Sequence, residues 1–207
     1  MEIQPTRSEL QEVNRKINLT RNGHRILKLK RDGLILEFFK ILDEAKDIRE
    51  ELVRKYIDAS QRIAIAEAVD GILAVRSAAM AISKEPKIEL LARNLMGVVV
   101  PEIETTTIHM PPEERGYGIL GTSPHIDLAT DSYQKLVETI VKAAELETTM
   151  RRLLDEIERT KRRVNALEFK VLPELLEIKR FIEMRLEEME RDNIFRLKRI
   201  KARAKEA

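Results

Sequence analysis

Apolar side chains recur at intervals of three and four residues through the first part of the chain. The series has thirteen positions, ten of them apolar: Leu10, Val13, Ile17, Thr20, His24, Leu27, Arg31, Leu34, Phe38, Ile41, Ala45, Ile48 and Leu52. This spacing places one narrow stripe along a helix, as in a seam that faces a partner helix. A capping box at Thr6–Glu9 marks its start. The pattern predicts a helix from Thr6 to about Ser83, with a break near Gly71.

Beyond Leu52 the spacing changes and small residues become more frequent. The seam is expected to continue through a shifted set of positions: Tyr56, Ala59, Ile63 and Ala66. These positions still follow the helical period, so the same helix is predicted to continue with a differently packed face.

The last part of the chain follows a different period. Its apolar positions are spaced by three, four and four residues: Val164, Leu167, Val171, Leu175, Ile178, Ile182, Leu186, Met189, Asn193, Leu197 and Ile200. An eleven-residue repeat corresponds to about 3.67 residues per turn and favours a straight or right-handed pair of helices. The pattern predicts a second long helix, capped by Thr130 or Ser132 and ending near Lys205. Pro173 lies inside it and is expected to bend it.

Glycine and proline collect in the middle of the chain. Four of the seven Gly and five of the seven Pro fall between Glu85 and Asp131. The β-branched runs at 98–103 and 105–108 read as short strand pieces, with Pro101 restricting the first to a sheet edge. Gly116–Gly121 is expected to supply a turn and a returning strand. The middle is therefore predicted to form a small β-hairpin at the far end of the paired helices.

These elements predict a mainly α fold. The two long helices are nearly equal in length, about 115 Å each at 1.5 Å per residue, and can pair as an antiparallel two-helix coiled coil. The chain is expected to form one structural unit with three parts: an N-terminal shaft helix (1–84), a middle region with loops and the hairpin (85–130), and a C-terminal shaft helix (131–207).

Composition excludes several functional classes. The 207 residues include no Cys and no Trp, and only 4% are aromatic. No disulfide framework or thiolate metal site is possible, and a stacking platform for single-stranded nucleic acid is disfavoured. Neither a membrane span nor a signal peptide is expected. Charged residues make up 36% of the chain, with a net charge of only +2, which suits long solvated helices.

The near-zero net charge conceals an uneven distribution. Residues 1–31 carry eight Lys and Arg against three acidic residues, and residues 195–207 carry six against one. In an antiparallel hairpin these segments are expected to lie side by side, giving one tip a charge of +10 and the remainder −8. An acidic or dipolar surface would receive such a tip. The alternative is a solvated basic end without a partner.

No residue pattern indicates catalysis, a cofactor site or a metal site. Gly116–Gly121 matches the letters G-x-G-x-x-G, but prolines flank it where a dinucleotide site requires a strand before and a helix after. A loop or hairpin is therefore preferred there. His24 lies in the first seam, where a polar residue that sets helix register is favoured over a proton-sensitive switch. Asn193 is expected to play the same part in the last helix. His109 and His125 are expected to be ordinary surface residues.

Several longer motifs stand out along the chain: PTRSEL (5–10), GHRILKLKRDGL (23–34), GVVVP (97–101), RRVNALE (162–168), Pro173 and RDNIFRLK (191–198). Together they resemble the D subunits of archaeal and vacuolar-type rotary ATPases. The resemblance extends over essentially the whole chain. It implies a non-catalytic central-stalk rotor that transmits rotation between the catalytic A/B hexamer and the membrane rotor ring. That rotation couples ATP synthesis or hydrolysis to proton or sodium transport.

The resemblance also implies partners and a location. The paired terminal helices would enter the hexamer, and the middle region would dock with the F subunit and with the subunit that links the stalk to the ring. No cofactor, nucleic acid or direct membrane insertion is implied, and the location is peripheral, at the cytoplasmic face of the cell membrane. The surface that meets the hexamer bore is expected to include five basic residues: Arg21, Arg25, Lys28, Arg196 and Lys198.

Two rival interpretations remain open on the residues alone. A prefoldin-like chaperone subunit also has a helix–hairpin–helix order, but it would present apolar rather than basic helix tips. A nucleic-acid-binding coiled coil would use the basic tip to neutralise phosphates, although no recognition motif or interleaved aromatic residues support it.

Overall fold

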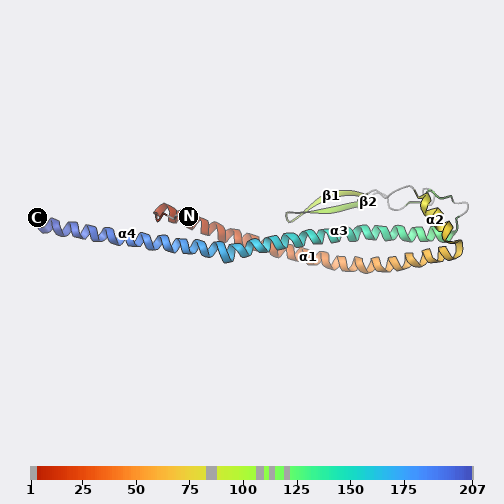
Figure 1. Cartoon of the computed structure of the whole chain (residues 1–207), viewed down its shortest axis with the longest axis horizontal. Coiled ribbons are helices and arrows are strands. Elements are labelled where there is room, and N and C mark those ends of the chain that lie inside the picture. The colour runs from red at the N-terminus through yellow and green to blue at the C-terminus, as the bar shows by residue number, and fades with distance from the viewer. Residues whose placement is uncertain (1–3, 83–87, 106–109, 112–114, 119–121, 207) are drawn as a thin grey trace. The chain divides into compact units, whose positions relative to one another are not determined.

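Along the chain, a first long helix is followed by a short helix, a β-hairpin and a second long helical stretch (Figure 1). The computed structural model describes residues 4–82, 88–105, 110–111, 115–118 and 122–206. The elements are α1 (Arg7–Asp70), α2 (Ile72–Ala81), β1 (Ile88–Leu95), β2 (Val98–Thr105), α3 (Pro124–Ala166), the π-helix η2 (Leu167–Val171) and α4 (Leu172–Glu206). The mainly α fold class with a small central hairpin is confirmed.

The chain divides into two compact units, which we describe separately. The terminal unit comprises Met1–Gly33 and Ile157–Ala207, and the middle unit comprises Leu34–Glu156.

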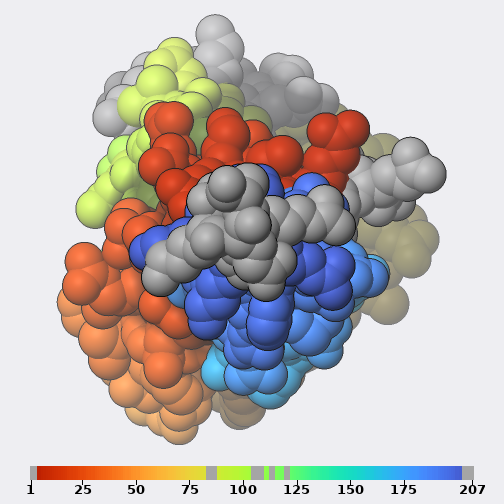
Figure 2. Space-filling view, turned by 90° about the vertical axis from the view of Figure 1, so that its left-hand side faces the viewer, coloured from red at the N-terminus to blue at the C-terminus, as the bar shows by residue number. Residues whose placement is uncertain are grey.

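In the terminal unit, α1 and the last helix pack side by side and antiparallel. Arg7 pairs with Glu190 at 2.6 Å, whereas His24, farther along α1, contacts Glu168 at 3.3 Å. The core between them is formed by Val13, Ile17 and Ile182, with leucines packed around it. In the space-filling view the first turns of α1 lie directly against α4 (Figure 2).

In the middle unit, α1 packs antiparallel against α3. The Lys55 ammonium donates to the Thr139 hydroxyl at 2.8 Å, and the Ser123 hydroxyl donates to the Asp70 carboxylate. Gly71 separates α1 from α2 with a φ of 86°, in the left-handed region that glycine adopts without strain. The predicted break near Gly71 is thus confirmed, and it lets α2 pack on α1 and α3 through Ala66, Ala78 and Ile126.

The predicted seam of α1 is confirmed as far as Leu52. Each of the thirteen positions is buried or half-buried, and Leu34 is fully enclosed. The predicted continuation fails at Tyr56, whose residue surface is 57% exposed. The half-buried Lys55 lies inward instead, because the Thr139 hydroxyl on the facing helix accepts a hydrogen bond from its ammonium group.

The hairpin exists, and β2 contains the strand piece predicted at 98–103, but its partner strand is not the predicted one. Val98–Thr105 pairs antiparallel with Ile88–Leu95, a segment that was not predicted to form a strand. Positive φ angles at Met96 (52°) and Gly97 (88°) make the tight two-residue turn that joins paired strands. Residues 115–117 form a bend. The rest of the predicted returning strand, 119–121, lies outside the described residues, as does 106–108 of the predicted second strand piece.

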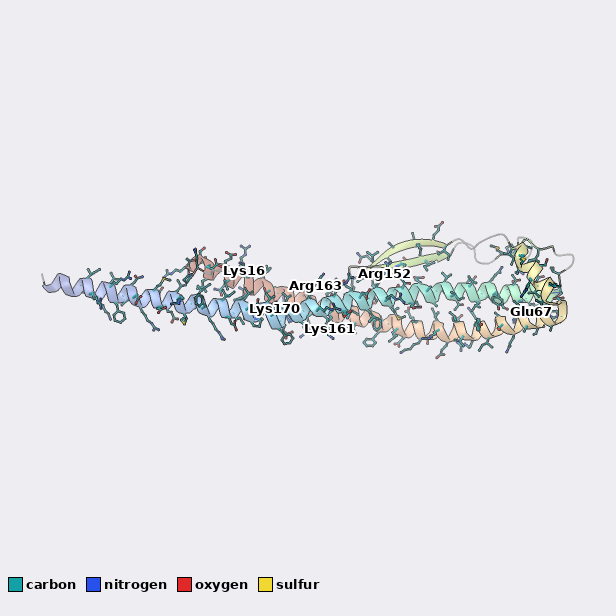
Figure 3. The ribbon with its side chains drawn as sticks, viewed as in Figure 1. Lys16, Glu67, Arg152, Lys161, Arg163 and Lys170 are labelled. Carbon is teal, nitrogen blue, oxygen red and sulfur yellow. The ribbon has the colours of Figure 1, made fainter. Side chains whose placement is uncertain are left out.

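The hairpin also lies in a different place from the one predicted. Arg152 of α3 donates to the Val99 carbonyl at 2.7 Å, and Val98 and Val100 are buried (Figure 3). Arg152 comes 28 residues after Pro124, which corresponds to about 42 Å of helix. The turn of the hairpin therefore lies along the side of α3 and not at the end where the helices reverse. The apolar face formed by Val98 and Val100 explains this, since it needs a helix to cover it.

Pro173 is accommodated by a local change of helix type. The Leu172 amide donates to the Leu167 carbonyl, five residues back, within the π-helix that immediately precedes the proline. Proline has no amide proton and crowds the carbonyl four residues earlier, so a wider turn relieves both problems. The π-helix also keeps Leu167, Val171 and Leu175 on the half-buried side, although two successive four-residue steps would drift around a regular α-helix.

Candidate partner-binding surfaces

The last turns of α4 form an exposed basic and apolar segment. Because Arg7 pairs with Glu190, residues 191–206 continue past the start of α1; we name them the α4 overhang. Its described side chains are exposed, including Ile194, Phe195, Leu197 and Ile200. The Lys198 ammonium lies 6.0 Å from the centroid of the Phe195 ring, a cation–π distance. The overhang presents apolar and cationic groups together.

The prediction that residues 1–31 and 195–207 lie side by side is wrong. The apolar cluster around Val13 and Ile182 sets the antiparallel register, and in that register the first turns of α1 lie beside Glu190. The two basic segments therefore follow one another along the terminal unit. The predicted seam of the last helix is wrong beyond Leu186, because Met189, Asn193, Leu197 and Ile200 are exposed, whereas His24 does lie half-buried in the first seam.

The five predicted bore residues fall into two separate groups. Arg21, Arg25 and Lys28 are exposed on one face of α1, at the helical spacing of four and three residues. Arg196 and Lys198 are exposed on the α4 overhang. The His24–Glu168 contact locates the first group beside η2, and Arg196 comes 28 residues after Glu168, about 42 Å farther along the helix.

An apolar stripe lies next to the first basic group, and the sequence-based interpretation missed it. Leu19, Ile26 and Leu29 are 73%, 62% and 66% exposed on α1. Their spacing of seven and three residues is itself a helical period, offset from the seam, and it is the signal that could have revealed them. Single exposed leucines are ordinary, but a stripe flanked by cations is typical of a contact surface.

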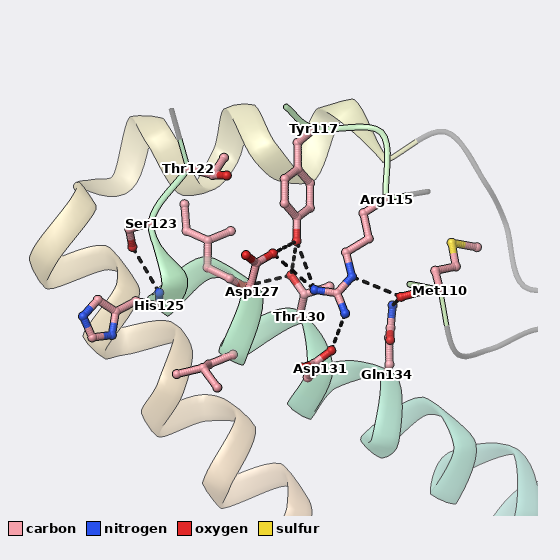
Figure 4. A network of polar contacts seen from close by, with 12 residues as sticks. Met110, Arg115, Tyr117, Thr122, Ser123, His125, Asp127, Thr130, Asp131 and Gln134 are labelled. Carbon is pink, nitrogen blue, oxygen red and sulfur yellow. Dashed lines mark hydrogen bonds and ion pairs between the residues drawn. The ribbon is translucent and has the colours of Figure 1, made fainter. Parts of the chain in front are cut away.

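A buried polar network fixes the loop before α3 (Figure 4). Arg115 is only 2% exposed, and its guanidinium donates to the Met110 carbonyl at 3.2 Å and to Asp127 at 3.2 Å. It also donates to Asp131, and the Tyr117 hydroxyl donates to Asp127 at 2.8 Å. Asp127 lies in the first turn of α3, where a carboxylate is favoured by the free amides of the helix start, and Asp131 lies one turn farther along.

The network holds Arg115 in its charged form. Burial alone lowers the pKa of Arg115, but its hydrogen bonds to Tyr117 and Asp131 outweigh that effect and raise the pKa above its ordinary value. The guanidinium ties the loop at Met110 and Tyr117 to Asp127 and Asp131 of α3, so the network can act as a structural clamp. No sequence signal identified Arg115, because it stands alone in loop sequence.

A small apolar cavity lies beside this clamp. It has a volume of about 190 Å³ and is lined by residues of α1, α2 and α3 and by Tyr117. Ala66, Val75 and Ile126 line it together with Tyr133. The cavity marks a loosely packed junction where α2 crosses the ends of the two long helices.

Gly116 is required where the loop passes α2. Its φ is 88°, and a Cβ atom there would lie 2.5 Å from the Ala81 carbonyl oxygen. Gly116→Ala is therefore expected to lower the free energy of unfolding by about 2 kcal/mol, measured by urea denaturation, since a left-handed backbone adds strain to the clash. An alanine that leaves stability unchanged would show that the loop moves freely away from α2.

The dinucleotide interpretation of Gly116–Gly121 gains no support. Gly116 and Gly118 belong to a loop, and α3 begins only at Pro124, where the Ser123 hydroxyl accepts a hydrogen bond from the His125 amide at 3.1 Å. His125 is half-buried in that first turn, and His109 lies outside the described residues.

Among the described residues, no three His, Cys, Asp or Glu side chains gather in a way that holds a metal ion. None of the helices in the same residues has the length and apolar character that a bilayer crossing requires.

Comparison with known proteins identifies the family. The model of the ATP synthase D-subunit family matches residues 9–202. The D subunit of the A-type ATP synthase of Methanoregula boonei is 59% identical over 202 residues, which cover 98% of this chain and 97% of that protein. The corresponding protein of Methanococcoides burtonii is 60% identical over 200 residues and 97% of both chains. That of Methanosarcina acetivorans is 57% identical over 204 residues, 99% of this chain and 98% of its own. The chain therefore belongs to the family of ATP synthase D subunits.

Proposed function

We propose that this chain is the central-stalk rotor subunit of an A-type ATP synthase. It transmits rotation between the catalytic A/B hexamer and the membrane rotor ring, and so couples ATP synthesis or hydrolysis to proton or sodium transport. The observation that carries the proposal is the family match over residues 9–202, together with relatives that are named D subunits of A-type ATP synthases and cover nearly all of the chain. The chaperone and nucleic-acid alternatives are set aside on the same ground.

The helical architecture supports a mechanical task. Paired helices with interlocked apolar side chains resist bending better than a single helix, and each unit pairs α1 with a second long helix. We propose that 1–84 and 131–207 act as shaft helices and that 85–130 acts as a middle region. The chain contributes no catalytic group of its own in this proposal, and its location is peripheral, at the cytoplasmic face of the cell membrane.

Assembly provides the first test. The chain is co-expressed with the A, B and F subunits and with the subunit that links the stalk to the ring, and the mass of the purified complex is measured. We expect one copy of the chain for each A/B hexamer. If the folded chain is present in the preparation but the purified A/B hexamer does not contain it, the proposal is contradicted.

The basic residues provide the second test. Replacement of Arg21, Arg25, Lys28, Arg196 and Lys198 by glutamine is expected to weaken binding to an A/B hexamer at least about tenfold at low salt, because exposed cations contribute mainly through electrostatic attraction. Binding is measured by titration without the F subunit, at two salt concentrations.

A matched control changes five exposed cations of the middle unit: Lys46, Arg49, Arg54, Lys142 and Arg151. The control removes the same charge from a different part of the chain and is expected to leave hexamer affinity within about twofold. Equal losses in both variants would show that net charge alone governs binding, and no loss in either would reject the assigned surface.

A further inference from the structure

The core of the terminal unit has no fully buried side chain over one stretch. On one side lies the cluster of Val13, Ile17 and Ile182, and on the other the next buried side chain of the last helical stretch is Val164. Between them, residues 18–33 and 165–181 are half-buried at most, although Leu172 and Leu175 still pack against the cluster. Because packing supplies most of the stability of paired helices, this level is held less firmly than its flanks.

The helix α1 is intrinsically weak at the same level. Five of the seven residues from 18 to 24 are poor helix formers: Asn18, Thr20, Asn22, Gly23 and His24. A glycine inside a helix is sometimes needed for a close approach, but a Cβ at Gly23 would have nothing within 4 Å. Packing does not demand a glycine there, so its effect is to loosen the backbone.

The opposite helix departs from regular geometry at the same level. The π-helix η2 occupies Leu167–Val171 and contains no buried residue, and Pro173 follows it within two residues. The wider turn lacks the regular α-helical hydrogen-bond spacing, and the proline removes one further donor. Such a segment resists bending less than the α-helix on either side.

A direct contact places the two weak segments opposite each other. The His24 ring nitrogen Nε2 lies 3.3 Å from the Glu168 carboxylate, which is inside η2. Gly23 is adjacent to His24, so the loosened part of α1 faces the π-helix. This contact is polar and half-exposed, and it ties the helices together without adding a buried apolar side chain.

We infer that residues 18–24 and 167–173 form one compliant joint within the terminal unit, at which both helices open and bend together. The less deeply buried core, the glycine and the π-helix each lower local resistance to bending, and their coincidence at one level distinguishes a joint from scattered weak points. The His24–Glu168 contact links the two sides. The inference concerns the chain itself and does not depend on its assembly with other subunits.

Hydrogen exchange of the full chain, followed by mass spectrometry, tests the joint. Amides of 18–24 and 167–173 are expected to exchange at least about tenfold faster than those of 10–17 and 174–186, after correction for sequence-dependent chemical rates. In the Pro173→Ala variant a regular α-helix becomes possible, and exchange is expected to slow at least about tenfold across 167–173. Exchange in 18–24 of the facing helix should slow as well, because the two sides open together.

Two glycine variants sharpen the result. Gly23→Ala is expected to slow exchange about fivefold in 18–24 and to slow it measurably in 167–173. Gly33→Ala makes the same replacement in the same helix outside the joint, and it should leave exchange in 167–173 unchanged. The inference is overturned if the joint is as protected as its flanks, or if each variant affects only its own helix.

A distance measurement gives an independent readout. The chain has no Cys, so spin labels can be attached at Arg159→Cys and Arg180→Cys, two exposed positions that flank η2. The mean distance between the two labels is expected to be about 31 Å, the length of a continuous helix of 21 residues, and the distance distribution is expected to be broad. Pro173→Ala should narrow that distribution, and an equally narrow distribution in the unmodified chain would also overturn the inference.

Discussion

Leu153→Ala is expected to lower the free energy of unfolding by about 3–4 kcal/mol. The Leu153 side chain is completely enclosed in the middle unit, and its loss removes apolar burial and leaves a cavity that the stiff helices fill poorly. The measurement is urea denaturation of the full chain followed by circular dichroism, with the midpoint and slope compared with those of the unmodified chain.

The next residue supplies a matched control. Leu154 is 49% exposed, so Leu154→Ala makes the same chemical change on a different face of the same helical turn. We expect it to cost less than about 1 kcal/mol, because half of the side chain is already in water. Similar losses in the two variants would show that the seam does not separate an inner from an outer face at this point.

Arg115→Met is expected to lower stability around the start of α3 by about 3 kcal/mol. Methionine fills a similar volume but removes the guanidinium donor from Asp127, Asp131 and the Met110 carbonyl, so that Asp127 keeps only the Tyr117 hydroxyl among its described donors. Removal of one partner from a buried charge pair commonly costs about 3–5 kcal/mol, and the lower limit applies because both carboxylates remain about 40% exposed. The chain has no Trp, so fluorescence of Tyr117 and Tyr133 can follow this region during denaturation.

Two further variants separate the contributions within the clamp. Tyr117→Phe removes a single hydroxyl donor and is expected to cost about 1 kcal/mol. Arg151→Met makes the arginine change at a site where the ion pair with Glu147 is largely exposed, and it should cost less than about 0.5 kcal/mol. If Arg115→Met were as mild as Arg151→Met, the network would be a surface feature and not a clamp.

The sequence predicted the features that depend on periodicity. The positions from Leu10 to Leu52 identified the inner face of α1 because a buried stripe must repeat every three or four residues. Gly71 marked a helix break because only glycine accepts its φ without strain. Both inferences follow from local rules that tertiary contacts do not override.

Features that depend on a partner elsewhere in the chain were not predictable in the same way. Ile88–Leu95 has no alternation of apolar and polar residues, so it did not read as a strand; its pairing depends on the turn at Met96 and Gly97. Lys55 entered the seam because Thr139 faces it, and Arg115 is buried because two aspartates of α3 receive it. None of these partners is visible from local sequence.

The π-helix was only partly predictable from the sequence. Pro173 predicted a disturbance, and the paired four-residue steps from Leu167 to Leu175 were visible in the sequence. A regular repeat of eleven residues explained the steps equally well, so the type of disturbance was not fixed. Only the bond from Leu172 to Leu167 distinguishes a π-helix from a smoothly wound helix.

The two edges of the hairpin differ in a way that affects handling of the free protein. The outer edge of β2 is blocked by the Arg152 side chain at Val99 and by Pro101, which has no amide proton. The outer edge of β1 carries neither protection, and all its residues except Leu95 are exposed. An open strand edge with exposed leucines is a template for intermolecular strand pairing. Self-association of the purified chain is therefore expected to begin at β1, and a charged residue in place of Leu90 is the substitution best placed to keep it monomeric.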